Sequence, residues 1–207
     1  MLEIKTFVVG LFQTNMHILH DEHGHVWMID PACSTEYERQ TVLRYMEMLP
    51  HGEGQPSVTI LATHGHLDHL WGAAWACRQW NQPVRMHEAD IPMAMAMQQQ
   101  YDLFGIPTTP EPFPIEPLAA EETPWSVIHT PGHTPGSVCL YDKDEHLLLS
   151  GDTLFACGYG RTDLPGGDTI QLIHSLRQLK TLPPETRVFC GHGESTTIGI
   201  EKNRLRL

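Results

Sequence analysis

Apolar and polar residues alternate in short runs at the start of the chain, and this period of two predicts strands. The runs occupy residues 4–9, 16–20 and 26–30, and a polar turn at residues 21–24 separates the last two. Consecutive strands joined by short turns pair antiparallel. The opening of the chain is therefore predicted to be an antiparallel meander.

The helical period first appears after this meander. Thr35 and Glu38 have the spacing of a capping box, which predicts the start of a helix. The residues that then share one helical face are Val42, Tyr45, Met46 and Leu49. A β-branched run at 58–62 and an apolar stretch at 70–80 predict a further strand and helix. Strand followed by helix is typical of an α/β arrangement.

The second half of the chain repeats this order. Strands are predicted at 125–130, 137–141 and 147–150, followed by a helix that Asp168 caps and a last strand at 187–190. Between the halves, a short strand at 83–87 and a helix around 93–97 precede the proline-rich residues 105–124, which we expect to be an extended connection. One face of the capped helix carries Leu172, Leu176 and Leu179.

Two meanders that each lead into helices predict two pseudo-equivalent halves. The expected fold class is α/β (α+β), a four-layer αβ/βα sandwich in which two mixed β-sheets face each other with helices on the outside. A length of 207 residues with 41% hydrophobic residues fits one large domain, so we expect a single domain over residues 1–207.

Candidate ligands for a metal cluster directly after the strand at 58–62. His64, His66, Asp68 and His69 fall on what we expect to be a loop at the carboxyl end of that strand, where α/β sheets place their sites. Imidazole and carboxylate without a nearby thiolate suit zinc, iron or manganese. Alternation along the loop directs His64 and His66 one way and Asp68 and His69 another, which favours two metals over one.

Three more ligand-type residues stand beside glycines at predicted strand ends. They are His133 in Thr-Pro-Gly-His-Thr-Pro-Gly, Asp152 in Ser-Gly-Asp-Thr and His192 in Cys-Gly-His-Gly. Glycine lets the backbone pass close to a metal, since it has no side chain. Together with the first loop, these motifs supply seven candidate ligands.

Composition narrows the choice of partners. A formal net charge of −12, from 25 acidic and 13 basic residues, argues against binding to nucleic acid or to an anionic membrane. The five cysteines are odd in number and widely spaced, so we expect buried thiols rather than a disulfide framework. No secretion signal or apolar stretch of membrane-spanning length is visible, which predicts a soluble cytoplasmic protein.

The sequence His-x-His-x-Asp-His, with the three later motifs in order, resembles the metallo-β-lactamase superfamily over nearly the whole chain. The resemblance implies a ligand set residue by residue. It assigns His64, His66 and His133 to one metal, Asp68, His69 and His192 to the second, and Asp152 to a bridge between them. Two divalent metal ions are thus the expected cofactors, with zinc expected and iron or manganese as alternatives.

Within the superfamily, residues 151–155, 160–168 and 191–199 look like those of short glyoxalase II-like hydrolases. This likeness implies a dinuclear zinc thioesterase that acts on S-lactoylglutathione or a related small-molecule thioester. Asp68 would bind the second metal and orient the attacking water. The C-terminal helical domain of full-length glyoxalase II is expected to be absent, which leaves the choice of thioester open. Arg161 is a candidate substrate contact, and the alternative is an arginine that stiffens its own loop.

The same motifs also fit other functions. A mononuclear iron persulfide dioxygenase is the main alternative, in which His64, His133 and Asp152 would form a facial triad. A non-catalytic metal-binding scaffold is the third interpretation, although structural sites are usually closed by four protein ligands. The fold also permits β-lactam hydrolysis and RNase activity. The oligomeric state cannot be predicted.

Overall fold

A computed structural model describes residues 2–49, 57–119 and 122–205 and divides the chain into two compact units. The first unit consists of Met1–Ala62, His66–Met86 and Ile91–Glu116. The second consists of Thr63–Gly65, His87–Asp90 and Pro117–Leu207. Each unit has its own sheet and its own apolar core. The expectation of one domain over residues 1–207 stays a prediction.

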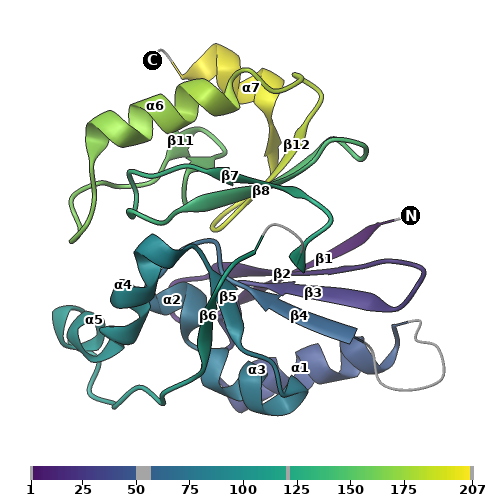
Figure 1. The fold of residues 1–207 in the computed structure, drawn as a ribbon, viewed down its shortest axis with the longest axis vertical. Helices are drawn as coiled ribbons and strands as arrows, with labels where there is room; N and C mark the ends of the chain where they lie inside the picture. Colours follow the sequence, from purple (N-terminus) through teal and green to yellow (C-terminus); the bar gives the residue numbers. More distant parts are fainter. Residues whose placement is uncertain (1, 50–56, 120–121, 206–207) are drawn as a thin grey trace. The chain divides into compact units, whose positions relative to one another are not determined.

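A six-stranded mixed sheet forms the centre of the first unit (Figure 1). Its strands, in spatial as well as chain order, are β1 (Glu3–Val9), β2 (Thr14–His20), β3 (His25–Ile29), β4 (Ser57–Leu61), β5 (Val84–Met86) and β6 (Ile115–Pro117). β1, β2 and β3 pair antiparallel, as the predicted meander requires, whereas β3, β4 and β5 pair parallel. The parallel strands are joined through helices, because a parallel connection must return along the sheet.

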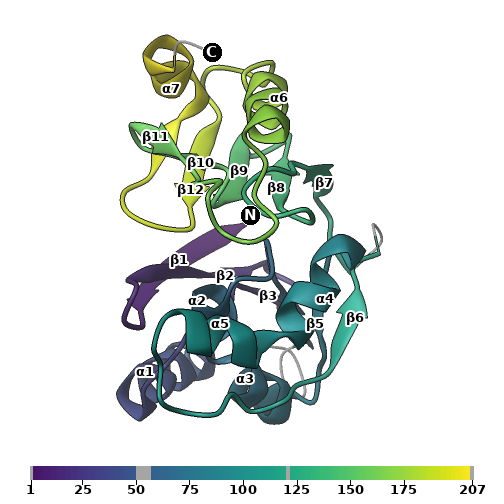
Figure 2. The same ribbon diagram turned by 90° about the vertical axis from the view of Figure 1, so that its left-hand side faces the viewer.

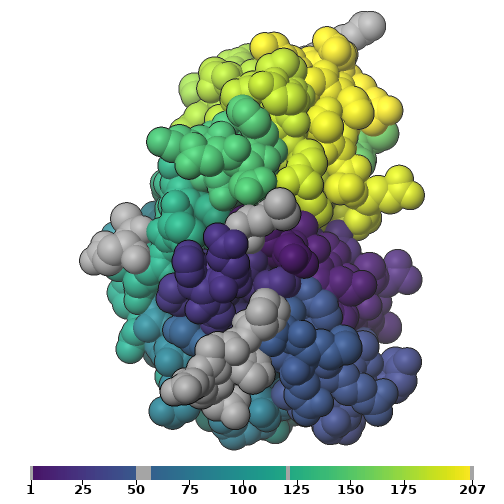
Figure 3. Space-filling model, turned by 90° about the vertical axis from the view of Figure 1, so that its right-hand side faces the viewer, coloured from purple at the N-terminus to yellow at the C-terminus, as the bar shows by residue number. Residues whose placement is uncertain are grey.

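The helices of the first unit are α1 (Glu36–Glu47), α2 (Leu67–Leu70), α3 (Ala73–Trp80), α4 (Ile91–Met95) and α5 (Met97–Leu103). The capping box is formed, since Thr35 accepts from the backbone of Glu38 and the Glu38 side chain reaches back. α1 and α3 lie on one face of the sheet (Figures 1 and 2). Val42 and Met46 are the buried residues of α1, and its other residues reach the surface in the blue region of Figure 3.

The second unit is built on a five-stranded mixed sheet in the order β13-β12-β9-β8-β7. Its strands are β7 (Ser126–His129), β8 (Val138–Asp142), β9 (Leu147–Gly151), β12 (Arg187–Cys190) and β13 (Thr196–Thr197). Only β9 and β12 pair parallel, and α6 (Thr169–Leu179) connects them. A small hairpin of β10 (Leu154–Phe155) and β11 (Gly158–Tyr159), the 3-10 helix η1 (Glu88–Asp90) and α7 (Ile198–Arg204) complete the unit.

The helices α6 and α7 cover one face of this second sheet (Figure 1). Their apolar side chains belong to one buried cluster with those of the sheet. The buried cluster includes Leu148, Leu172, Leu176, Val188 and Ile198. Asp168 caps α6 by accepting from the backbone N–H groups of Ile170 and Gln171, as predicted. Two mixed sheets with their helices confirm the predicted fold class.

Some local predictions change. The helix expected around 93–97 breaks at Ala96 into α4 and α5. The proline-rich segment contains β6 and is not uniformly extended, since turns or bends occur at residues 105, 108 and 122–124; its residues 120–121 lie outside the described residues. Cys157 is exposed, so the expectation of a buried thiol is wrong there; the other four cysteines are buried. No helix within the described ranges is long and apolar enough to cross a bilayer.

Candidate metal centre

His133 lies in the turn between β7 and β8 in the second unit, and one hydrogen bond fixes its tautomer. Its Nδ1 is 2.8 Å from the backbone oxygen of Arg161. Because a carbonyl oxygen can only accept, Nδ1 must carry the proton, and Nε2 of the neutral ring keeps its lone pair. That Nε2 lies 3.5 Å from Oδ2 of Asp152. The ring therefore presents a ligand atom towards a carboxylate.

Asp152 follows β9, and its Oδ2 faces two histidines. The distance from this oxygen is 3.5 Å both to Nε2 of His133 and to Nε2 of His192. Two ligands that each lie about 2.1 Å from a tetrahedral metal are separated by roughly 3.4 Å. The observed spacing is longer than a good hydrogen bond and fits a cation shared by Asp152 with each histidine. The spacing of these three donor atoms thus fits residues that would hold a metal.

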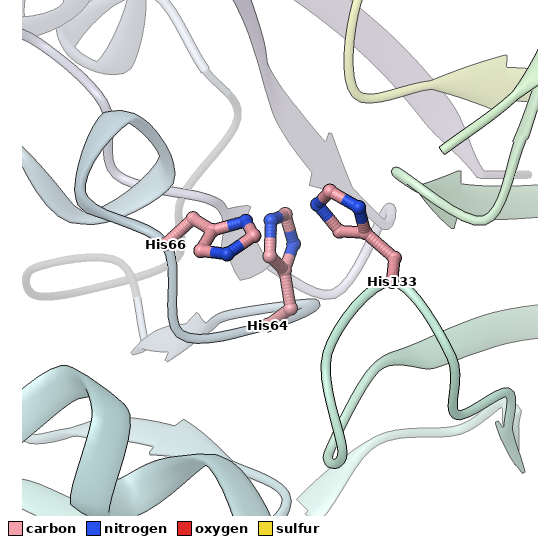
Figure 4. Close-up of side chains that lie close together, drawn as sticks. All are labelled: His64, His66 and His133. Atoms are coloured by element: carbon pink, nitrogen blue, oxygen red, sulfur yellow. The ribbon is translucent and has the colours of Figure 1, made fainter. Parts of the chain in front are cut away.

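His64 belongs to the same unit. Its ring centroid is 4.9 Å from that of His133, and the planes meet at 74° (Figure 4). Donor atoms of His64 lie within 4.8 Å of donor atoms of His133 and of Asp152. Thr63 places its hydroxyl 3.1 Å from Nδ1 of His64, which leaves Nε2 as the ligand atom. Four predicted ligands therefore lie together in the second unit. His64 and His133 are buried, whereas Asp152 and His192 are partly exposed.

Asp68 and His69 belong to the first unit. They lie on the helical turn α2, not on a loop as we expected, because residues 67–70 close a turn of helix directly after the His-x-His segment. The hydroxyl of Thr14 donates to Oδ2 of Asp68 over 3.0 Å. Nε2 of His69 lies 3.6 Å from the same oxygen, again the spacing of two ligands on one metal.

Asp30 forms a hydrogen bond with the Nδ1 side of the His69 ring. Its Oδ2 accepts a hydrogen bond of 2.8 Å from Nδ1 of His69, and both side chains are almost completely buried. A carboxylate on the outer nitrogen fixes the ring and raises the basicity of the ligand nitrogen. In the sequence, Asp30 is only the last residue of the strand predicted at 26–30. An aspartate before proline at the end of a buried strand was the available signal, but it named no partner.

His66 is the remaining predicted ligand. It occupies the N-cap position of α2 with extended backbone angles and is 8% exposed. Gly65 alone separates it from His64 along the chain. Of the seven predicted ligands, three therefore lie in the first unit and four in the second.

A family model described as the metallo-beta-lactamase superfamily matches residues 9–192, which include every candidate ligand. The chain belongs to this superfamily. It is 32% identical to the hydroxyacylglutathione hydrolase GloC of Haemophilus influenzae over 97% of this chain and 95% of that protein.

Solved structures agree with this membership. TTHA1623 in a di-iron-bound form is 34% identical, covers 98% of each chain and has a TM-score of 0.83. The BLEG-1 B3 metallo-beta-lactamase is 33% identical, covers 97% of each chain and has a TM-score of 0.82. This chain is therefore a metallo-hydrolase of the superfamily, whose members normally bind two divalent metals.

Arg161 contacts the candidate ligand His133 through its backbone. Its carbonyl oxygen orients His133, whereas its guanidinium binds Asp163 through Nε and Nη2 at 2.6 Å each. The Arg161 hydrogen bonds lower the pKa of Asp163 to about 2. This pairing matches the loop-stiffening alternative. A substrate contact by Arg161 stays a prediction. Its side chain is 57% exposed and therefore accessible to a ligand.

Proposed function

We propose that this metallo-hydrolase is a dinuclear thioesterase of the glyoxalase II type, acting on S-lactoylglutathione or a related thioester. The observation that carries the proposal is the position of Asp152. One of its carboxylate oxygens, Oδ2, lies 3.5 Å from Nε2 of His133 and 3.5 Å from Nε2 of His192. The similarity to GloC over nearly the full length of both proteins supports the substrate class.

The proposed ligand assignment is the one that the sequence motifs imply. His64, His66 and His133 would hold one metal, Asp68, His69 and His192 the second, and Asp152 would bridge. Bound there, two divalent cations would lower the pKa of a shared water and polarise the thioester carbonyl. Zinc suits these imidazole and carboxylate donors, and the di-iron form of TTHA1623 supports iron as the alternative.

The residues of the chain have distinct tasks in this proposal. Asp68 would orient the attacking water, because Thr14 fixes one of its carboxylate oxygens by a hydrogen bond. Asp30 and the carbonyl of Arg161 keep the rings of His69 and His133 in the tautomers that direct Nε2 inward. A thiolate leaves without prior protonation, so thioester cleavage needs no dedicated general acid.

The experiment compares three reactions of one purified preparation. Thiol release from S-lactoylglutathione is measured with a thiol-reactive dye, oxygen uptake with glutathione persulfide, and hydrolysis with a chromogenic β-lactam. We expect thiol release that chelation abolishes and zinc restores, without oxygen uptake. Oxygen uptake without thiol release would instead establish the persulfide dioxygenase.

Hydrolysis of β-lactams is the second candidate, because BLEG-1 is 33% identical over 97% of both chains. If the chromogenic β-lactam is cleaved and the thioester is not, the thioesterase proposal is wrong while the metallo-hydrolase assignment stands.

A further inference from the structure

Asp90 is a fully buried aspartate in the second unit, at the end of η1. Its Oδ2 accepts from the backbone N–H of Gly65 at 2.7 Å and from the hydroxyl of Thr134 at 2.6 Å. Its Oδ1 accepts from the backbone N–H of Gly136 at 2.5 Å. One carboxylate thus binds two segments that are about 70 residues apart in sequence.

Both segments carry metal ligands. Gly65 directly follows His64, and Thr134 directly follows His133. The donors that Asp90 holds are therefore one residue from each histidine. A substitution of Asp90 would shift Gly65 and Thr134. Because each is the chain neighbour of a histidine, the backbones of the two histidines would move relative to each other.

The packing around Asp90 is tight. A Cβ added at Gly136 would lie 2.6 Å from the Asp90 nitrogen and 2.7 Å from its Cγ, so only glycine fits there. The rings of His87 and His129 stack at 4.2 Å with an angle of 7°, so the residue before η1 packs against the last residue of β7. This ring stack gives His87 and His129 a structural role, because it links the segment that carries Asp90 to the strand that leads into the His133 turn.

The charge of Asp90 is not matched by the protein. Within the described ranges, neither lysine nor arginine forms an ion pair with it, and its three hydrogen-bond donors are neutral groups. Burial and then His129 lower the pKa of His87, which keeps that nearby ring neutral at pH 7. A buried carboxylate is costly without an opposite charge. Cations bound by the neighbouring His64 and His133 would supply it.

We infer that Asp90 is a positioning residue of the metal centre, which aligns the His64 and His133 backbones and adds negative charge that favours cation binding. The inference rests on the metal-binding part of the proposed function and is independent of the substrate.

The test is Asp90→Asn with Asp142→Asn as the matched control. Asp142 also accepts two backbone N–H groups, from Asp144 and Glu145, but its turn carries no ligand. In Asp90→Asn the amide N–H₂ replaces an oxygen that accepts from either one or two donors, so at least one bond is lost together with the charge. We expect zinc to bind roughly 10 to 100-fold more weakly in Asp90→Asn, measured by competition with a chromogenic chelator, and normally in Asp142→Asn.

Thermal unfolding of zinc-loaded and zinc-free protein separates positioning from simple stability. Zinc should raise Tm less in Asp90→Asn than in the wild type or Asp142→Asn, because weaker binding gives less stabilisation. Equal Tm losses with and without zinc, at unchanged zinc affinity, would overturn the inference. If Asp90→Asn does not fold, Thr134→Val removes one of the three donors and should show the same effect at smaller size, whereas Thr134→Ser should not. A Thr134→Val variant with wild-type zinc affinity would then overturn it.

The outcome also distinguishes this inference from the proposed function. Failure of thioester hydrolysis leaves the zinc measurements intact. Wild-type protein that binds no divalent metal would overturn both, whereas normal zinc affinity in Asp90→Asn overturns only the role of Asp90.

Discussion

Gly160 offers a sharp test of the second unit's site, because it lies directly against two proposed metal ligands. A Cβ at this position would lie 1.9 Å from the backbone oxygen of Asp152 and 3.0 Å from Nδ1 of His133. Real Cβ atoms essentially never approach another heavy atom within 3.0 Å. Gly160→Ala must therefore displace the backbone by about 1 Å, since the obstructing atom is itself backbone.

This displacement reaches the metal ligands through the next residue. The carbonyl of Arg161 accepts from His133 over 2.8 Å, and a shift of this size breaks that bond. We expect a loss of about 1 to 3 kcal/mol in the free energy of unfolding from the steric conflict. At this chain length, each kcal/mol lowers Tm by roughly 2 to 4 °C. Zinc affinity should fall roughly 10 to 100-fold, because His133 loses the group that orients it.

Gly158→Ala is the matched control, since Gly158 lies two residues before Gly160 and a Cβ there meets nothing within 4 Å. Zinc affinity by chelator competition and Tm by circular dichroism are measured for both variants. Identical values for Gly160→Ala and Gly158→Ala would refute the proposed link between this loop and the ligands.

Three further variants test individual residues. Asp68→Asn should lower kcat for thioester hydrolysis by about 10² or more while one metal is largely retained, because one site loses an anionic ligand; unchanged turnover would remove Asp68 from the mechanism. Asp152→Ala should lose metal at both sites and lower Tm, as shown by elemental analysis and thermal unfolding, and a full metal content would contradict the bridge. Arg161→Ala should raise KM for glutathione thioesters about tenfold if the guanidinium binds substrate, whereas equal losses on a neutral thioester and in Asp163→Ala would indicate loop stiffening. NMR titration of Arg161→Ala should show the pKa of Asp163 rising from about 2 towards 3.8, because the hydrogen bonds from Arg161 that lower it are gone. In the wild type, the stabilisation from this pair is fully present above pH 3.8 and is lost as the pH falls through the folded-state pKa.

Features with nearby partners could be predicted from the sequence. Thr35 and Glu38 form the capping box that their spacing indicates, and Asp168 caps α6. Each of these contacts spans only a few residues, so the local sequence determines both partners. The longer strands of both sheets were predictable for the same reason, since alternation is a property of a few consecutive positions, whereas the short strands β6 and β13 were not predicted.

Contacts between distant segments could not be predicted. Asp30 orients His69 across 39 residues, and Asp90 holds Gly136 across 46. An isolated aspartate at a strand end or in a short helix carries no periodic signal that names its partner. Strand pairs as short as β10 with β11 could not be predicted either, because two residues are too few to show a period.

The stoichiometry of metal needed for thiol release tests the central claim most directly. Metal-free protein is titrated with zinc, and in parallel with ferrous iron under anaerobic conditions, while thiol release from S-lactoylglutathione is recorded at each addition. A dinuclear thioesterase predicts activity that reaches its maximum at about two equivalents of metal per chain. A contradicting result would be no thiol release from S-lactoylglutathione at any metal content, together with oxygen uptake in the presence of glutathione persulfide that saturates at one equivalent of iron when the iron-loaded samples are transferred to aerated buffer.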